Sequence, residues 1–201
     1  MLVKRSALSA GGSGKDLSDG WVLNFAVGCT HGCLFCYVDR IWRLHSKNRH
    51  SPYYGLELGE WGQYFYVPSD LEEQIRRTPW QRWRGARVLM SSTHDPYLPE
   101  LYFPNKWPRR ILETALPRGV RFTVLTRSAL PNFDLYARYR EHIMLMSSIP
   151  TLDDAFAEAT EPRAPGGGAR LAMLRKAKEL GIEVGVVVAP IITRSGWRQD
   201  L

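Results

Sequence analysis

The chain has 201 residues, of which 44% are hydrophobic and 23% are charged. This length allows one domain with a sizeable core, and the ordinary composition excludes a disordered chain. No apolar run is long enough to span a membrane and no signal-peptide core follows the basic start, so we expect a cytoplasmic protein without membrane contact. The formal net charge of +7 favours anionic partners without identifying one.

Composition divides the chain into three parts. Residues 1–20 are polar and rich in glycine and serine, which predicts a flexible N-terminal segment. Apolar segments recur from residue 21 onward, so we predict one core domain over residues 21–192. Residues 193–201 are expected to form a C-terminal tail.

Apolar runs of strand length alternate with helical segments through the core domain. Strands are predicted at residues 21–27, 87–90, 120–125, 143–146 and 184–189, and helices at about 35–44, 69–77, 108–116, 133–140 and 168–180. Ser69 and Glu72 have the spacing of a capping box at the start of the second helix, whereas residues 45–67 predict an irregular or hairpin-like insertion. The alternation is typical of an α/β fold whose parallel sheet forms either a barrel or an open sheet.

Polar segments follow the predicted strands. They are residues 28–37, 91–95, 126–128 and 147–148. In barrels and in open parallel sheets alike, ligands bind at the carboxyl ends of the strands. We therefore expect these four segments to surround one mouth.

All three cysteines of the chain lie in the first of these segments, as Cys29, Cys33 and Cys36 with the spacing C-x3-C-x2-C. Thiolates this close in sequence can share one metal centre. A closed zinc site would need a fourth ligand, for which the nearby histidines are His31, His45 and His50. A cubane iron–sulfur cluster with three cysteines would leave one iron open for chemistry. A third interpretation is that the cysteines are buried hydrophobic side chains that bind no metal.

Cys29, Cys33, Phe35 and Cys36 match C-x3-C-x-aromatic-C, and here the sequence resembles the radical S-adenosylmethionine (SAM) superfamily. The resemblance implies that the cysteines bind a [4Fe-4S] cluster, that SAM chelates its fourth iron, and that SAM is cleaved to a 5′-deoxyadenosyl radical. It further implies a reductant such as flavodoxin or ferredoxin. The cofactors would carry the chemistry, while the protein binds and orients them.

The resemblance also implies a partial (βα)6 barrel of the TIM type. Only five strands are predicted, and a sixth would follow Ile192, where little sequence remains. We therefore expect a barrel truncated after about five strands. An open sheet edge is prone to pair with other chains, so an oligomer that covers this edge is a further expectation.

Several other blocks resemble the spore photoproduct lyase branch, whose members are DNA repair photolyase-like proteins. They include residues 24–37, 91–100, 125–128 and 147–165. The resemblance implies that the cofactor-binding residues are Phe35, Tyr37, Ser92, Thr93, Asp95, Arg127, Ser147 and Arg170. Arg170 would pair with the SAM carboxylate, because a guanidinium forms a planar fork with a carboxylate. Each residue also has a structural alternative, such as a turn-opening role for Asp95.

One position departs from that branch. Its DNA-repairing members use a cysteine at the end of the second strand to return a hydrogen atom to the thymine radical, and here this position is Ser92. A serine O–H bond is too strong to donate a hydrogen atom readily to a carbon radical. All three cysteines are committed to the cluster motif, which argues against thymine-dimer repair by this route.

Three functions follow from these observations. The first is a photolyase-like radical SAM enzyme, with lyase as one candidate activity. The sequence does not identify its substrate. The second is a nucleic-acid-binding module, because residues 80–87 interleave tryptophans with arginines as single-strand stacking platforms do. Their structural alternative is a helix end with buried tryptophans and solvated arginines. The third is a truncated, non-catalytic iron–sulfur protein.

Overall fold

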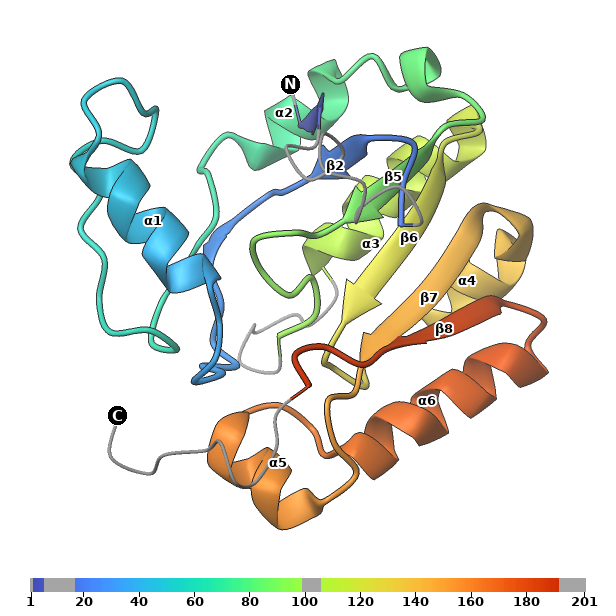
Figure 1. The fold of residues 1–201 in the computed structure, drawn as a ribbon. Helices are drawn as coiled ribbons and strands as arrows, with labels where there is room; N and C mark the ends of the chain where they lie inside the picture. The colour runs from blue at the N-terminus through green and yellow to red at the C-terminus, as the bar shows by residue number, and fades with distance from the viewer. Residues whose placement is uncertain (1, 6–16, 99–105, 192–201) are drawn as a thin grey trace.

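The computed structural model of the protein describes residues 2–5, 17–98 and 106–191 (Figure 1). The strands are β1 (Val3–Arg5), β2 (Trp21–Leu23), β3 (Val27–Gly28), β4 (Phe65–Tyr66), β5 (Arg87–Met90), β6 (Arg121–Thr126), β7 (Ile143–Ser148) and β8 (Glu183–Val187). The α-helices are α1 (Val38–Lys47), α2 (Leu71–Arg77), α3 (Lys106–Ala115), α4 (Phe133–Arg138), α5 (Asp154–Thr160) and α6 (Gly167–Glu179). Short 3₁₀ helices span Trp80–Trp83, Leu116–Arg118 and Arg140–His142.

Most strands form one sheet in the order β1-β2-β5-β6-β7-β8. Five of these strands, β2, β5, β6, β7 and β8, run parallel to one another, which confirms the predicted α/β fold with a parallel sheet. These five correspond to the five predicted strands. The predicted place of a sixth, after Ile192, lies outside the described residues, as do residues 193–201.

The first strand of the sheet was not expected. β1 pairs antiparallel with β2, with Val3 opposite Leu23, and both of these side chains are fully buried. The sheet therefore recruits part of the segment predicted to be flexible, while residues 6–16 of that segment lie outside the described part. A three-residue strand gives too little periodicity to be recognised from sequence.

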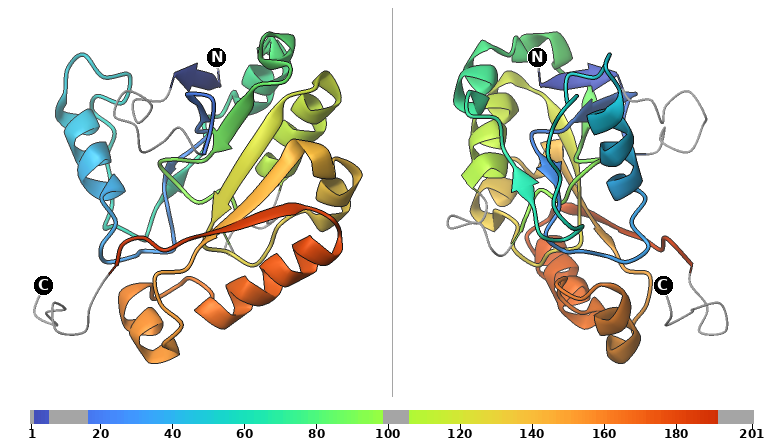
Figure 2. Two further views of the ribbon diagram at one scale, coloured as in Figure 1. Left: turned by 45° about the vertical axis from the view of Figure 1, so that its right-hand side comes forward. Right: turned by 90° about the vertical axis from the view of Figure 1, so that its left-hand side faces the viewer.

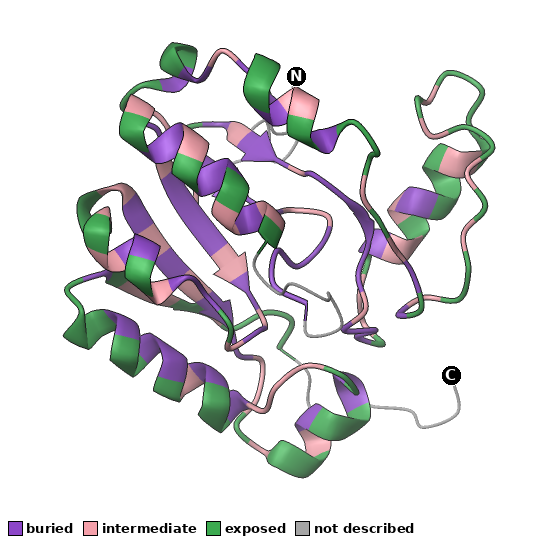
Figure 3. Cartoon of the chain, turned by 180° about the vertical axis from the view of Figure 1, so that it is seen from behind, coloured by how far each residue is buried: buried purple, intermediate pink, exposed green. Residues whose placement is uncertain are grey.

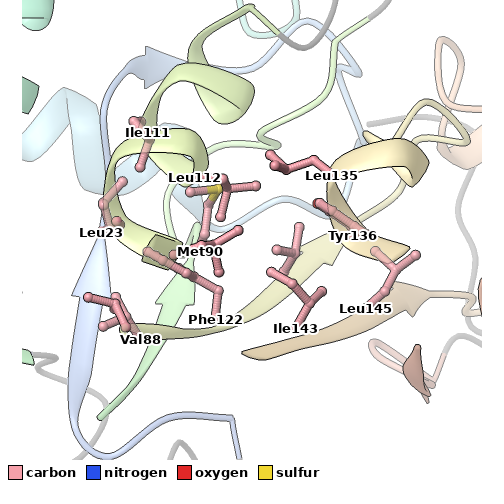
Figure 4. Close-up of a cluster of buried hydrophobic side chains, with 14 of the residues drawn as sticks. Leu23, Val88, Met90, Ile111, Leu112, Phe122, Leu135, Tyr136, Ile143 and Leu145 are labelled. Carbon is pink, nitrogen blue, oxygen red and sulfur yellow. The ribbon is translucent and has the colours of Figure 1, made fainter. Parts of the chain in front are cut away.

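Helices cover one face of the sheet. Figure 3 shows α2, α3, α4 and α6 side by side, with buried residues toward the strands and exposed residues toward solvent. In Figure 4, Ile111 and Leu112 of α3 lie close to Met90 of β5. Leu135 and Tyr136 of α4 also belong to this buried cluster. Contact with these helices explains the apolar side chains that the strands place on this face.

The tryptophans of the proposed stacking platform belong to the core. Trp80 and Trp83 are 1% and 3% exposed, and Trp80 Nε1 donates to the Ile75 carbonyl at 2.9 Å. Arg82 and Arg84 face solvent. The stacking-platform interpretation of this segment is therefore wrong, because buried rings cannot stack on bases.

Two helix starts differ from the predictions. Asp70, not Ser69, precedes α2, and no side-chain capping bond forms there, so the predicted capping box is wrong. α5 was not predicted, although Asp153 accepts a capping bond from Phe156 N at 3.1 Å. Across the described ranges, every helix is too short or too polar to cross a membrane.

The insertion after α1 folds back on β3, the strand that directly precedes the cysteine loop. β3 and β4 form a two-stranded antiparallel sheet beside the main one. Figures 1 and 2 show α1 and the following loop standing apart from the main sheet, with the cysteine-bearing loop between them and the sheet. The insertion thus forms one wall beside the carboxyl ends of the strands.

Candidate functional site

The cysteine loop begins where β3 ends. Gly28 has a φ of +93°, and a Cβ atom there would lie 2.4 Å from the Tyr64 carbonyl oxygen and equally near its ring. Only glycine permits this close approach. Cys29 and Cys33 are buried and Cys36, just before α1, is half-buried. The insertion therefore determines where the first cysteine lies.

Distant segments hold the rest of the loop. Leu34 N donates to the Thr160 carbonyl at 3.0 Å, and His31 Nδ1 lies 3.3 Å from the Arg163 carbonyl. The Arg163 guanidinium in turn donates to the Gly62 carbonyl. The loop is thereby fixed between the insertion and the segment that follows α5.

Asp95, in the turn after β5, joins three elements. Its Oδ1 accepts from Thr126 Oγ1 at 2.6 Å and its Oδ2 accepts from Arg127 N at 2.6 Å. His31 Nε2 lies 3.3 Å from Oδ2. Burial alone would raise the pKa of Asp95, but His31 and the bonds from Arg127 and Thr126 outweigh burial and hold the pKa below its usual value. The carboxylate is thus ionised and ties the cysteine loop to the end of β6.

A second buried carboxylate, Glu161, lies beside Cys33. Its Oε1 is 4.0 Å from Cys33 Sγ and also accepts from Arg127 Nη1. Its Oε2 is 2.9 Å from Arg170 Nη2. Arg170 also donates to the carbonyls of Pro165 and Ser148, each at 2.7 Å. Glu161 was not predicted as a site residue, since nothing in its local sequence distinguishes it from a solvated glutamate.

The cysteine loop, Asp95 and Arg127 line a pocket of about 140 Å³. It is lined by Cys29, His31, Cys33, Cys36, Tyr37, Val38, Trp61, Ser91, Ser92, Thr93, His94, Asp95, Leu125, Thr126, Arg127 and Ser148. The pocket unites the cysteine loop with the carboxyl ends of β5, β6 and β7, as predicted.

Five of the predicted cofactor-binding residues line the pocket: Tyr37, Ser92, Thr93, Asp95 and Arg127. Thr93 Oγ1 is buried there without a hydrogen-bond partner among the described residues. A buried hydroxyl without a partner is costly, so a polar ligand group in the pocket would stabilise it. Tyr37 donates to the Ser92 carbonyl at 3.2 Å.

The other three predicted residues do not line it. The Phe35 ring centroid lies 5.1 Å from Cζ of Arg127, and the Ser147 hydroxyl donates to the Thr126 carbonyl at 3.0 Å within the sheet. Arg170 is 1% exposed, and its Nη2 lies 2.9 Å from Glu161 Oε2. The structure therefore gives Arg170 an internal partner in place of the expected SAM carboxylate.

The donor set suits a cluster better than a single zinc ion. His31 is held by Asp95 and the Arg163 carbonyl, and His45 Nδ1 lies 3.2 Å from Ser51 Oγ. Within the described part of the chain, no three metal-ligating side chains converge on one point. A mononuclear zinc site needs such convergence, whereas in a cubane each cysteine binds a different iron.

Burial raises the pKa of all three thiols, that of Cys33 to about 12 despite the opposing charge of Arg127. Thiolates in such surroundings need positive charge beside them. Iron bound to the sulfurs supplies it, since metal binding favours the deprotonated thiol. Deprotonation of these buried thiols would therefore be coupled to metal binding.

A parallel α/β sheet with a three-cysteine loop at its carboxyl edge is the arrangement expected of a cluster-binding enzyme. The family model "Radical SAM superfamily" matches residues 23–197, and the chain belongs to that superfamily. Its members use a [4Fe-4S] cluster and SAM, which confirms the predicted family and cofactors.

Two curated relatives are similar in sequence. The uncharacterized protein ORF301 of Acidianus two-tailed virus is 50% identical over the whole chain, and the uncharacterized protein MJ0683 of Methanocaldococcus jannaschii is 26% identical over 86% of it. The chain spans 66% and 60% of the lengths of these relatives, less than two thirds of each.

Spore photoproduct lyase structures are similar in fold. A complex with dinucleoside spore photoproduct gives a TM-score of 0.55 at 22% identity, covering 89% of this chain and 48% of the lyase. A variant with bound AdoMet and the same dinucleoside gives 0.57 at 21% identity, with the same coverage. At these identities the likeness shows the fold, and it confirms the predicted partial barrel.

Proposed function

We propose that this chain is a photolyase-like radical SAM enzyme that binds its cluster at Cys29, Cys33 and Cys36 and SAM in the adjoining pocket. One observation carries the proposal: three free thiols and the polar ends of three parallel strands line the same cavity. When bound, the cluster and SAM supply a 5′-deoxyadenosyl radical. We further propose a flavodoxin- or ferredoxin-type reductant and a cytoplasmic location.

Each pocket residue would bind a different part of SAM or of the substrate. The Thr93 hydroxyl, which has no partner among the described residues, is available to a polar group of SAM or substrate. The Tyr37 ring, at the rim, would pack against the adenine. Arg127, anchored at its backbone by Asp95, would face the methionine or ribose end. Asp95 itself positions the loop, because its oxygens are already engaged by protein groups.

Ser92 makes the reaction different from thymine-dimer repair. Its Oγ accepts from Asn24 Nδ2 at 3.0 Å and its N–H donates to Asn24 Oδ1 at 2.8 Å, so Asn24 fixes this residue in the pocket wall. A fixed hydroxyl can orient a substrate by hydrogen bonding. It cannot replace a thiol as a hydrogen-atom donor, so we propose a substrate whose radical is resolved by another route.

SAM cleavage tests the proposal. Protein reconstituted anaerobically with iron and sulfide should be brown and should form 5′-deoxyadenosine from SAM in the presence of dithionite. Cys33→Ala should abolish both, with unreconstituted wild type as the control, because the chain has no cysteine outside the motif. A colourless wild-type protein would refute the proposal. A brown protein that leaves SAM intact would favour the non-catalytic iron–sulfur protein.

A further inference from the structure

Glu161 is a charged residue that the proposed binding of SAM does not use. Its side chain is 1% exposed and belongs to the residue that ends α5. It contacts Arg127 at one oxygen and Arg170 at the other, and it lies 4.0 Å from Cys33 Sγ. Burial of a carboxylate is unfavourable unless it is paired, and here two guanidinium groups pair with it.

The charges of this group do not cancel. Arg127 and Arg170 carry two positive charges and Glu161 carries one negative charge. Cys33 donates no proton once its sulfur binds iron, so the sulfur and the carboxylate would then be two negative groups in direct contact. The arginines offset their repulsion. Arg170 is 1% exposed, and the Arg127 guanidinium contacts Glu161 and also donates to the Ala189 carbonyl at 3.3 Å.

We propose that Glu161 is a positioning residue that sets the reduction potential of the cluster, by offsetting one of the two arginine charges beside Cys33. The inference rests on the proposed function. Reduction adds one electron to the cluster, and the potential of an iron–sulfur cluster depends on nearby net charge and on hydrogen bonds to its sulfurs. A negative charge 4.0 Å from a ligand sulfur, shielded from water, opposes that electron.

The sign of the effect separates this role from a merely structural one. Removal of the carboxylate leaves both arginines unopposed and should make the potential less negative. Removal of the Arg127 cation leaves Glu161 paired with Arg170 and should make it more negative. A structural ion pair would lower stability in both variants without giving potentials that shift in opposite directions.

Redox titration monitored by electron paramagnetic resonance tests the inference on the full chain reconstituted with its cluster and without SAM. The variants are Glu161→Gln, Arg127→Gln and the double variant. Glu158→Gln is the matched control, because Glu158 lies on α5 just before Glu161 and is exposed. We expect a less negative potential for the first variant, a more negative one for the second, a value near wild type for the double variant and no change for the control.

The outcomes are distinct. Shifts of the same sign in both single variants, or no shift in either, would overturn the inference while leaving SAM cleavage intact. If Glu161→Gln yields no soluble protein, Glu161→Asp, which withdraws the carboxylate from Cys33, takes its place: a less negative potential supports the inference and an unchanged one refutes it. A wild-type chain that binds no cluster would overturn this inference and the proposed function together.

Discussion

The close approach of Gly62 to Gly32 predicts that a single methyl group would disturb the cysteine loop. Gly62 has a φ of +88°, and a Cβ atom there would lie 2.8 Å from the Gly32 Cα. The atom that the new Cβ would meet belongs to the backbone of Gly32, so no side-chain rotation can relieve the contact. Gly62→Ala should therefore displace the segment that carries Cys29 and Cys33.

The magnitude has two parts. Alanine in a left-handed conformation costs roughly 1–2 kcal/mol. Overpacking adds roughly 1–3 kcal/mol. Gly55 provides the control, because it has a φ of +78° and a methyl group there would meet no described atom within 4 Å. Gly55→Ala should therefore show only the conformational cost, and any gain from a less flexible unfolded chain should be similar in both variants.

Urea unfolding followed by circular dichroism, with iron counted per chain after anaerobic reconstitution, measures both consequences. Gly62→Ala should be less stable than Gly55→Ala by about 1–3 kcal/mol. In a chain of this length, that difference lowers the melting temperature by roughly 2–12 °C. Gly62→Ala alone should also retain less iron. Equal stability and equal iron content in the two variants would show that the glycine contact does not position the cysteines.

Two further predictions concern buried rings. Burial lowers the pKa of His94 from 6.5 to about 3 despite the opposing charge of Asp95, so below pH 6.5 the unfolded chain binds a proton that the folded chain does not. Because of this group, the free energy of unfolding should fall by about 1.4 kcal/mol per pH unit below pH 6.5, or by about 2 kcal/mol at pH 5. Urea unfolding of His94→Gln at several pH values should lack this part of the pH dependence. The same pH dependence in wild type and variant would contradict the prediction. Trp80→Ala should cost about 3–5 kcal/mol. Arg82→Ala should stay within about 0.5 kcal/mol in the same assay, and a reversed order would contradict the burial of the tryptophan.

The sequence was sufficient for the five parallel strands and for the edge at which the site lies. Residues 120–125 and 143–146 were recognisable as largely apolar runs of strand length, and they are observed as β6 and β7. α5 was missed, although Asp153 before it was an available capping signal. β1 spans only three residues and gave no pattern.

The sequence could not predict the direction in which side chains point within the site. Ser147 and Ser148 are adjacent on β7, and successive residues of a strand face opposite sides, so only one of them lines the pocket. The sequence does not say which, and Ser148 is the one. Arg170 was assigned to SAM from the family resemblance, and its sequence context gave no sign of burial. Its partner Glu161 is set by tertiary packing that no local pattern reveals.

The contacts that hold the cysteine loop also impose an order on biosynthesis. Cys33 and Glu161 are 128 positions apart, and His31 and Arg163 are 132 apart. Contacts of such long range form late in folding, because a large loop must close first. The cysteines leave the ribosome long before the residues that position them. A nascent chain would therefore expose three reactive thiols without their pocket, and specific cluster insertion should follow synthesis of α5 and Arg163 rather than accompany emergence of the motif.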